Sequence, residues 1–159
     1  MACDSCWASY GTQTVSAIKI IRLSSGALLG EAGDNDSRAM RELLDKIKTP
    51  QKLPSRKELS ETKLNYEALI AFPKGGVWMI TTGRHDEVGY PLDEDGSTMS
   101  DADYGVWPAT TMGGFAAVGC GADIALGAMD VGATAKEAVQ TACKRNVHCR
   151  LPVHVVKVN

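Results

Sequence analysis

The chain has 159 residues, of which 44% are apolar and 23% are charged, and its formal net charge is −2. This length predicts one domain, because a chain of this size buries roughly 70% of its unfolded surface in one core. The small negative charge gives no reason to expect a nucleic-acid partner. No apolar run reaches the ~20 residues of a membrane helix, and no signal peptide is evident, so we expect no membrane partner and a cytoplasmic protein.

The five cysteines are an odd number, which favours free thiols in a reducing compartment over a disulfide framework. Cys3 and Cys6 have the spacing of a metal or redox pair, but no second such pair follows in the sequence. In an extended strand these two residues also face opposite ways. We therefore expect small strand residues here, and neither a metal nor another cofactor. His148 and His154, near Cys149, share no face that would suggest a metal site either.

The first third of the chain predicts a strand pair followed by a helix. Residues 15–22 and 27–33 are the expected strands, joined by a tight turn at 24–26. A helix is predicted from Asp34, and Pro50 and Pro54 are expected to stop it. Four apolar residues recur on one face of this helix, namely Met40, Leu43, Leu44 and Ile47.

A β-hairpin is the strongest local prediction in the middle of the chain. Residues 66–73 and 77–82 are strand-like and flank the turn at 74–76, where glycines can adopt positive φ. Residues 51–64, before the hairpin, are polar and predict a connector with one short helical turn at most. Residues 83–113, after it, have little periodicity and predict a long loop or insertion.

The C-terminal part predicts a strand, two helices and a final strand. Residues 114–119 read as a buried strand, and 120–129 turn into a helix of small residues that Gly132 ends. A capping box at 134–137 starts the second helix at once. Residues 152–158 alternate as a closing strand. The order of strands and helices along the chain predicts an antiparallel, layered α+β fold.

Three ordered stretches, residues 19–34, 113–139 and 152–158, resemble the proteasome β-subunit family, and most of all its HslV-type bacterial and phage-encoded members. The resemblance implies one domain over residues 1–159, with 83–113 as a loop or insertion. It implies an α+β fold, a four-layer αββα sandwich of two antiparallel sheets. The activity implied is that of an N-terminal-nucleophile threonine peptidase, in which the α-amino group of the threonine acts as general base.

The resemblance also assigns candidate catalytic residues. Asp4, in the opening MACDSC, matches an aspartate that helps hold the catalytic lysine and threonine, and Lys19 matches that lysine. A nearby positive charge lowers the pKa of an amine or a hydroxyl. Gly119, Cys120 and Gly121 match a Gly-Ser-Gly turn whose backbone N–H groups suit an oxyanion hole.

The sequence departs from the family at its beginning, where members carry a strand with the nucleophilic threonine before the Asp4 position. The present chain starts Met1-Ala2 and is expected to be inactive as written. Two explanations stay open: Met1 is an internal methionine of a longer reading frame, which we favour, or the protein is a dead relative. Cys120 also replaces the usual serine, and Asn146, His148 and Cys149 stand where members tend to show other residues.

Two further readings compete with the peptidase. Asp4 and Lys19 taken alone could be an ordinary cross-strand ion pair, and the whole chain could be a non-catalytic module that forms rings or binds a partner. The partners implied by the resemblance are copies of the chain itself in a ring, an ATPase unfoldase, and a protein or peptide substrate.

Overall fold

The computed structural model describes residues 1–4, 6–9, 12–15, 19–33, 38–61, 66–82 and 105–158. The strands are β1 (Ala2–Cys3), β2 (Cys6–Ser9), β3 (Thr12–Val15), β4 (Ile20–Arg22), β5 (Leu28–Gly33), β6 (Tyr66–Phe72), β7 (Gly76–Thr82), β8 (Gly105–Pro108) and β9 (His154–Val155). The α-helices are α1 (Arg38–Asp45), α2 (Arg56–Glu61), α3 (Ala122–Asp130) and α4 (Ala135–Arg145), with 3₁₀ helices at Pro50–Lys52 and Ala109–Met112.

The centre of the fold is a five-stranded antiparallel sheet in the order β4-β5-β6-β7-β8. The predicted hairpin forms its middle, since β6 pairs with β7 from Tyr66↔Thr82 to Phe72↔Gly76. Gly76 has a φ of 74°, a left-handed conformation that glycine adopts at little cost. The antiparallel α+β class predicted from the sequence is therefore confirmed.

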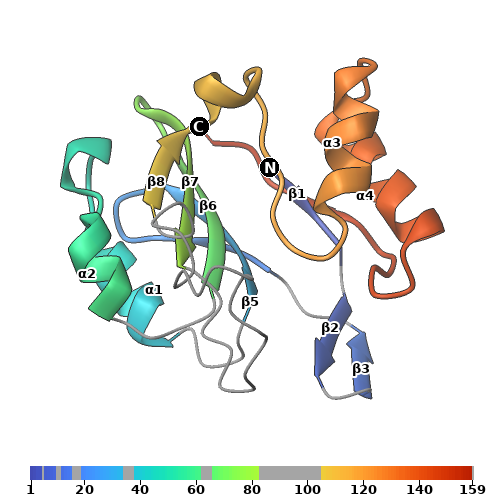
Figure 1. Ribbon diagram of the computed structural model, residues 1–159, viewed down its shortest axis with the longest axis horizontal. Coiled ribbons are helices and arrows are strands. Elements are labelled where there is room, and N and C mark those ends of the chain that lie inside the picture. The colour runs from blue at the N-terminus through green and yellow to red at the C-terminus, as the bar shows by residue number, and fades with distance from the viewer. Residues whose placement is uncertain are drawn as a thin grey trace, which may run out of the picture.

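Helices α1 and α2 cover one face of this sheet (Figure 1). In the core between the sheet and these helices, alternate residues of the strands pack against apolar residues of the helices, including Met40, Leu44 and Leu59. The predicted helical face is correct for these residues, although the helix ends at Asp45 and Ile47 packs from the turn after it. Pro50 therefore starts a 3₁₀ helix and does not itself stop α1.

The opposite face of the sheet carries β1, β9 and the helices α3 and α4 (Figure 1). β1 pairs with β9 through Ala2↔Val155 and Cys3↔His154, which joins the two ends of the chain. A second apolar cluster forms here, in which Ile20, Leu28 and Ala71 of the sheet pack against residues of the terminal segments, namely Met1, Cys3, Val156 and Val158. Helix α4 starts with the predicted capping box between Thr134 and Glu137.

The structure corrects several predicted elements. The connector 51–64 holds helix α2, longer than one turn, which starts at a Ser55–Glu58 pair of reciprocal hydrogen bonds that the sequence already contained. The predicted loop 83–113 ends in strand β8 and a 3₁₀ helix, and residues 83–104 lie outside the described residues. Two predicted strands are shorter or irregular: 152–158 contributes only β9, and 115–118 have no regular secondary structure.

The β2–β3 hairpin was not predicted at all. Its register runs from Cys6↔Val15 to Ser9↔Thr12. In the sequence, two residues, Tyr10-Gly11, separate the two strand segments, and a spacing of two residues is typical of hairpins. The predicted strand 15–22 is also divided, because β3 ends at Val15 and β4 begins at Ile20, with 16–18 outside the described residues.

A buried carboxylate ties α1 to the sheet. The side chain of Glu31 on β5 is only 2% exposed and accepts a 2.6 Å bond from Nε of Arg41. The hydroxyl of Tyr66 donates to its other oxygen at 3.1 Å. Burial, then the Glu31 charge, strongly raises the pKa of Tyr66, so this hydroxyl stays a donor.

Replacing Arg41 with methionine should lower the free energy of unfolding by about 2–4 kcal/mol, because a buried charge that loses its partner is left uncompensated. Arg38→Met is the matched control, since Arg38 pairs with Glu42 on the exposed surface of the same helix and its loss should cost less than about 1 kcal/mol. Urea denaturation of the three proteins measures both values, and equal losses would contradict the role of Arg41.

Candidate functional site

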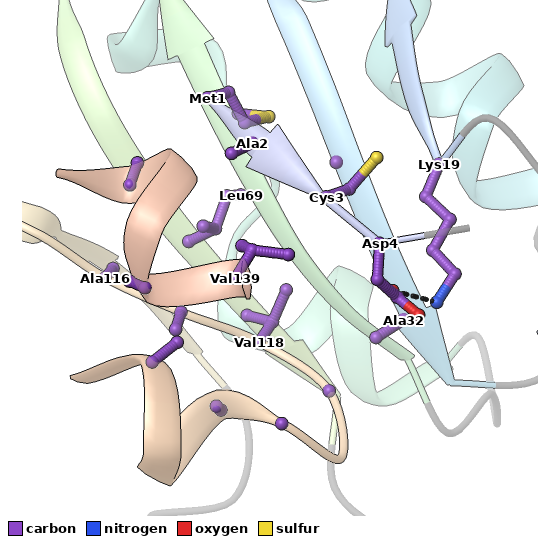
Figure 2. Close-up of a pocket in the computed structure, with 18 of the residues that line it drawn as sticks. Met1, Ala2, Cys3, Asp4, Lys19, Ala32, Leu69, Ala116, Val118 and Val139 are labelled. Atoms are coloured by element: carbon purple, nitrogen blue, oxygen red, sulfur yellow. Dashed lines mark hydrogen bonds and ion pairs between the residues drawn. The ribbon is translucent and has the colours of Figure 1, made fainter. Parts of the chain in front are cut away.

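Asp4 and Lys19, which the resemblance brought forward, lie in direct contact. Nζ of Lys19 donates to Oδ1 of Asp4 at 2.7 Å, and their side chains are only 18% and 12% exposed, respectively. Asp4 follows β1 directly, and Lys19 stands just before β4, so two separate strands bring the charges together (Figure 2). The other carboxylate oxygen, Oδ2, accepts the backbone N–H of Arg150 at 3.1 Å.

The turn at Gly119–Gly121 is fixed by four hydrogen bonds. Gly119 has a φ of 89°, and its N–H donates to Oε2 of Glu67 at 2.9 Å. Its carbonyl accepts from the N–H of Ala122 at 2.9 Å, and the carbonyl of Gly121 accepts from the N–H of Ala125 at 3.0 Å, which leads the turn into α3. Nδ2 of Asn146 donates to the carbonyl of Cys120 at 2.6 Å.

This bonding limits which amides could stabilise an oxyanion. The N–H of Gly119 already donates to a carboxylate, and a negative charge at that position would be opposed by Glu67. The amides of Cys120 and Gly121 therefore remain the candidates in the predicted Gly119–Gly121 turn.

A pocket of about 820 Å³ unites the candidate residues. Its floor is the face of the five-stranded sheet that lies opposite α1 and α2. Helices α3 and α4, which contribute several alanines, form its roof. β1 borders it on one side, and Ala116 and Val118 lie across from β1 (Figure 2). All five predicted site residues line this pocket: Asp4, Lys19, Gly119, Cys120 and Gly121.

Three thiols also line the pocket, from Cys3, Cys120 and Cys149. Burial, and next the neighbouring Cys120, raise the pKa of Cys149 to about 12. Burial likewise raises the pKa of Cys3. Since the thiolate is the nucleophilic form, neither Cys3 nor Cys149 is prepared for attack at neutral pH. The side chain of Cys6 lies outside the described residues, so the strand-face argument for the Cys3–Cys6 pair stays a prediction.

Sequence reasoning did not assign site roles to Glu67, Asn146 or Arg150, although each anchors a predicted site residue. For Glu67 a signal exists: it alternates with Tyr66 and Ala68 along β6, so its side chain falls on the face opposite the α1 core. Arg150 acts through its backbone, which no residue pattern reveals. Among the described residues, no three His, Cys, Asp or Glu side chains are grouped to hold a metal ion.

Comparison with solved structures gives the class of fold first. It is a mixed α+β fold of the proteasome-like type, which confirms the predicted resemblance at the level of fold. One similar solved structure is that of BPH, a bacterial proteasome homologue from Thiobacillus denitrificans. The TM-score is 0.64 and the identity 17%, over 99% of this chain and 91% of that chain. The same protein in complex with epoxomicin gives a TM-score of 0.61 and 16% identity, over 99% of this chain and 92% of that chain.

No family model matches the sequence, and no curated protein matches it either. In the described part of the chain, no helix has the length and apolar character to cross a membrane.

The packing at the Gly119–Gly121 turn can be tested by comparing two glycine-to-alanine substitutions, one in the turn and one in α3. A Cβ at Gly121 would lie 2.7 Å from Sγ of Cys149 and 3.1 Å from Cβ of Ala142, so Gly121→Ala should destabilise the protein by about 1–3 kcal/mol. A Cβ at Gly127, inside α3, would meet nothing within 4 Å, so Gly127→Ala should stabilise it by about 0.5–1 kcal/mol. Opposite signs in thermal or urea unfolding are expected, and a neutral Gly121→Ala would refute this packing.

Proposed function

We propose that the chain is a subunit of a proteasome-like peptidase, in which Asp4 and Lys19 serve a nucleophilic threonine carried by an extended segment that lies in the pocket. The single observation that carries the proposal is the position of the ion pair. It is largely buried and lines the pocket between β1 and residues 115–118. A buried ion pair is costly to maintain for stability alone, and it commonly marks a functional site.

The pocket itself favours a strand as its occupant. Residues 115–118 are half-buried, yet in the described part of the chain they take part in no strand pairing. Half-buried backbone N–H and C=O groups need hydrogen-bond partners. A strand between β1 and 115–118 would supply them and would extend the β1–β9 pair into a second sheet. The fold would then be the four-layer αββα sandwich that the sequence resemblance implies.

The proposed chemistry is the hydrolysis of a peptide bond through an acyl-enzyme. The threonine hydroxyl would lose its proton to the threonine's own α-amino group, whose ordinary pKa of about 7.7–8.0 suits a general base at neutral pH. The ammonium of Lys19 would stabilise the developing alkoxide, and Asp4 would hold that ammonium in place. The oxygen then attacks the carbonyl carbon, the amine leaves with a proton, and water releases the acyl group.

In this proposal, the nucleophilic hydroxyl comes from a residue other than the described residues that line the pocket. Among the described residues that line the pocket, none is serine or threonine. The thiols of Cys3 and Cys149 have raised pKa values. The proposal therefore places the nucleophilic threonine on a segment other than the described residues that line the pocket.

The test compares two forms of the protein, one starting at Met1 and one extended by the codons that precede Met1 in the natural reading frame. The extended form should cleave short fluorogenic peptides and should bind epoxomicin, the molecule found in complex with the T. denitrificans homologue. Lys19→Ala in the extended form should lower kcat/KM by roughly 10²–10⁴-fold. Lys74→Ala, an exposed lysine in the β6–β7 turn, is the matched control and should leave the rate unchanged.

Either of two results would reject the peptidase. One is a stop codon in frame ahead of Met1 with no threonine between them. The other is an extended form that neither cleaves peptides nor is labelled by epoxomicin in mass spectrometry. The non-catalytic module, with the same fold, would then be the better account.

Self-assembly is part of both accounts. Three large apolar residues beside α3 and after α4 are strongly exposed: Val131 (87%), Val147 (71%) and Leu151 (59%). We propose that they contribute to contacts between copies in a ring, which would work with an ATPase unfoldase on protein or peptide substrates in the cytoplasm. Free thiols at Cys3, Cys120 and Cys149 suit that reducing compartment.

Analytical ultracentrifugation tests the assembly. The native chain should sediment as a particle of several subunits, and the double change Val131→Lys with Val147→Lys should shift it to smaller species, because a buried ammonium without a partner opposes the contact. Lys74→Ala serves again as the control. A monomeric native chain would contradict the ring.

A further inference from the structure

The thiols of Cys120 and Cys149 lie close to each other in the wall of the pocket. Their sulfurs are 3.9 Å apart, although the residues are 29 positions apart in the chain. Cys120 is exposed, and Cys149 is buried. A disulfide has a sulfur–sulfur distance of 2.03–2.05 Å, so the two atoms need to approach by only about 2 Å.

The backbone on both sides of this pair is already held together. Nδ2 of Asn146 bonds to the carbonyl of Cys120 at 2.6 Å, and the N–H of Cys149 bonds to the carbonyl of Asn146 at 3.1 Å. Gly121 lets the sulfur of Cys149 pack directly against the turn, since a Cβ there would lie 2.7 Å from it. The two segments that carry the cysteines are therefore already joined by hydrogen bonds before a disulfide forms.

We propose that Cys120 and Cys149 form a reversible disulfide and are a thiol-modification site of this fold. The oxidant is a low-molecular-weight disulfide, which supplies the two-electron acceptor. The thiolate of Cys120 attacks one of its sulfurs and releases the first small thiol. The thiolate of Cys149 then attacks Cys120 in this mixed disulfide and releases the second small thiol, so that two protein thiols become one disulfide and two small thiols are formed.

The exposure of the two residues fixes this order. Cys120 is exposed to an oxidant in solution, while Cys149 is buried. The charge and hydrogen bond of Cys120 help to keep the pKa of Cys149 high, and both disappear once Cys120 is capped. Capping therefore makes the buried thiol a better attacking group at the moment when it is needed.

The disulfide would act on the candidate site. It would join the Gly119–Gly121 turn to the segment before Arg150, whose N–H holds Oδ2 of Asp4. The loop that it closes contains α3 and α4, which form the roof of the pocket. Any effect on catalysis rests on the proposed function, whereas formation of the bond does not.

The experiment treats the native chain with oxidised glutathione at neutral pH, then alkylates free thiols and measures the mass. The five thiols should fall to three, a peptide linking Cys120 to Cys149 should appear, and dithiothreitol should restore all five. The melting temperature should rise by roughly 5–10 °C, because the crosslink restricts the unfolded chain. Cys143→Ser, which removes a neighbouring half-buried thiol, is the matched control and should still form the bond.

Cys120→Ser, at an exposed position, should leave folding intact and abolish the crosslink. Three results would overturn the proposal: five thiols after treatment, a mixed disulfide at Cys120 that persists without closing, or a crosslink to Cys143. The measurement is independent of peptidase activity. An inactive protein that forms the crosslink supports this site and rejects only the proposed function.

Discussion

The carboxylate of Asp4 connects three parts of the chain that are far apart in sequence. One oxygen binds the ammonium of Lys19 at the start of β4, and the other accepts the N–H of Arg150 after α4. Asp4 itself follows β1, which pairs with β9. If this carboxylate lost its charge, Lys19 would remain largely buried without its anion, and the relative position of the sheet and the α3–α4 layer would lose a direct link.

Two glutamates of the sheet likewise use their carboxylates to link distant segments, one on each face of the sheet. Glu31 on β5 points to the α1 side and binds Arg41, while Glu67 on β6 points to the pocket side and binds the N–H of Gly119. β5 and β6 pair with Ala32 opposite Glu67, so neighbouring strands present carboxylates to opposite faces. The sheet thus anchors a helix on one side and the pocket turn on the other, which keeps the turn in register with Asp4.

The elements predicted correctly are those whose signals are local. The capping box at Thr134, the glycine of the β6–β7 turn and the apolar face of α1 each depend on residues within a few positions of one another. The misjudged elements depend on distant partners. Residues 115–118 have the composition of a buried strand, but a strand exists only where another segment completes its hydrogen bonds, and composition cannot supply that segment.

The same distinction applies to the candidate site. The resemblance singled out Asp4 and Lys19 as a pair, and the geometry now places them in contact. It did not assign site roles to Glu67 or to the amide of Arg150, because these act through contacts that span 52 and 146 positions of the chain. Backbone groups have no sequence signature, so their part in a site emerges only when the fold is known.

The walls of the pocket bear on what it binds. An apolar lining alone would suit a small hydrophobic molecule, but the roof contains small residues of α3 and α4, among them Ala125, Ala138 and Ala142. Small side chains leave room for backbone to approach closely. Within the described residues, 115–118 belong to no sheet, and an apolar small molecule could not form hydrogen bonds with their backbone groups. The polypeptide strand of the proposed function would satisfy both conditions, with side chains toward the sheet and the helices and its own backbone between β1 and 115–118.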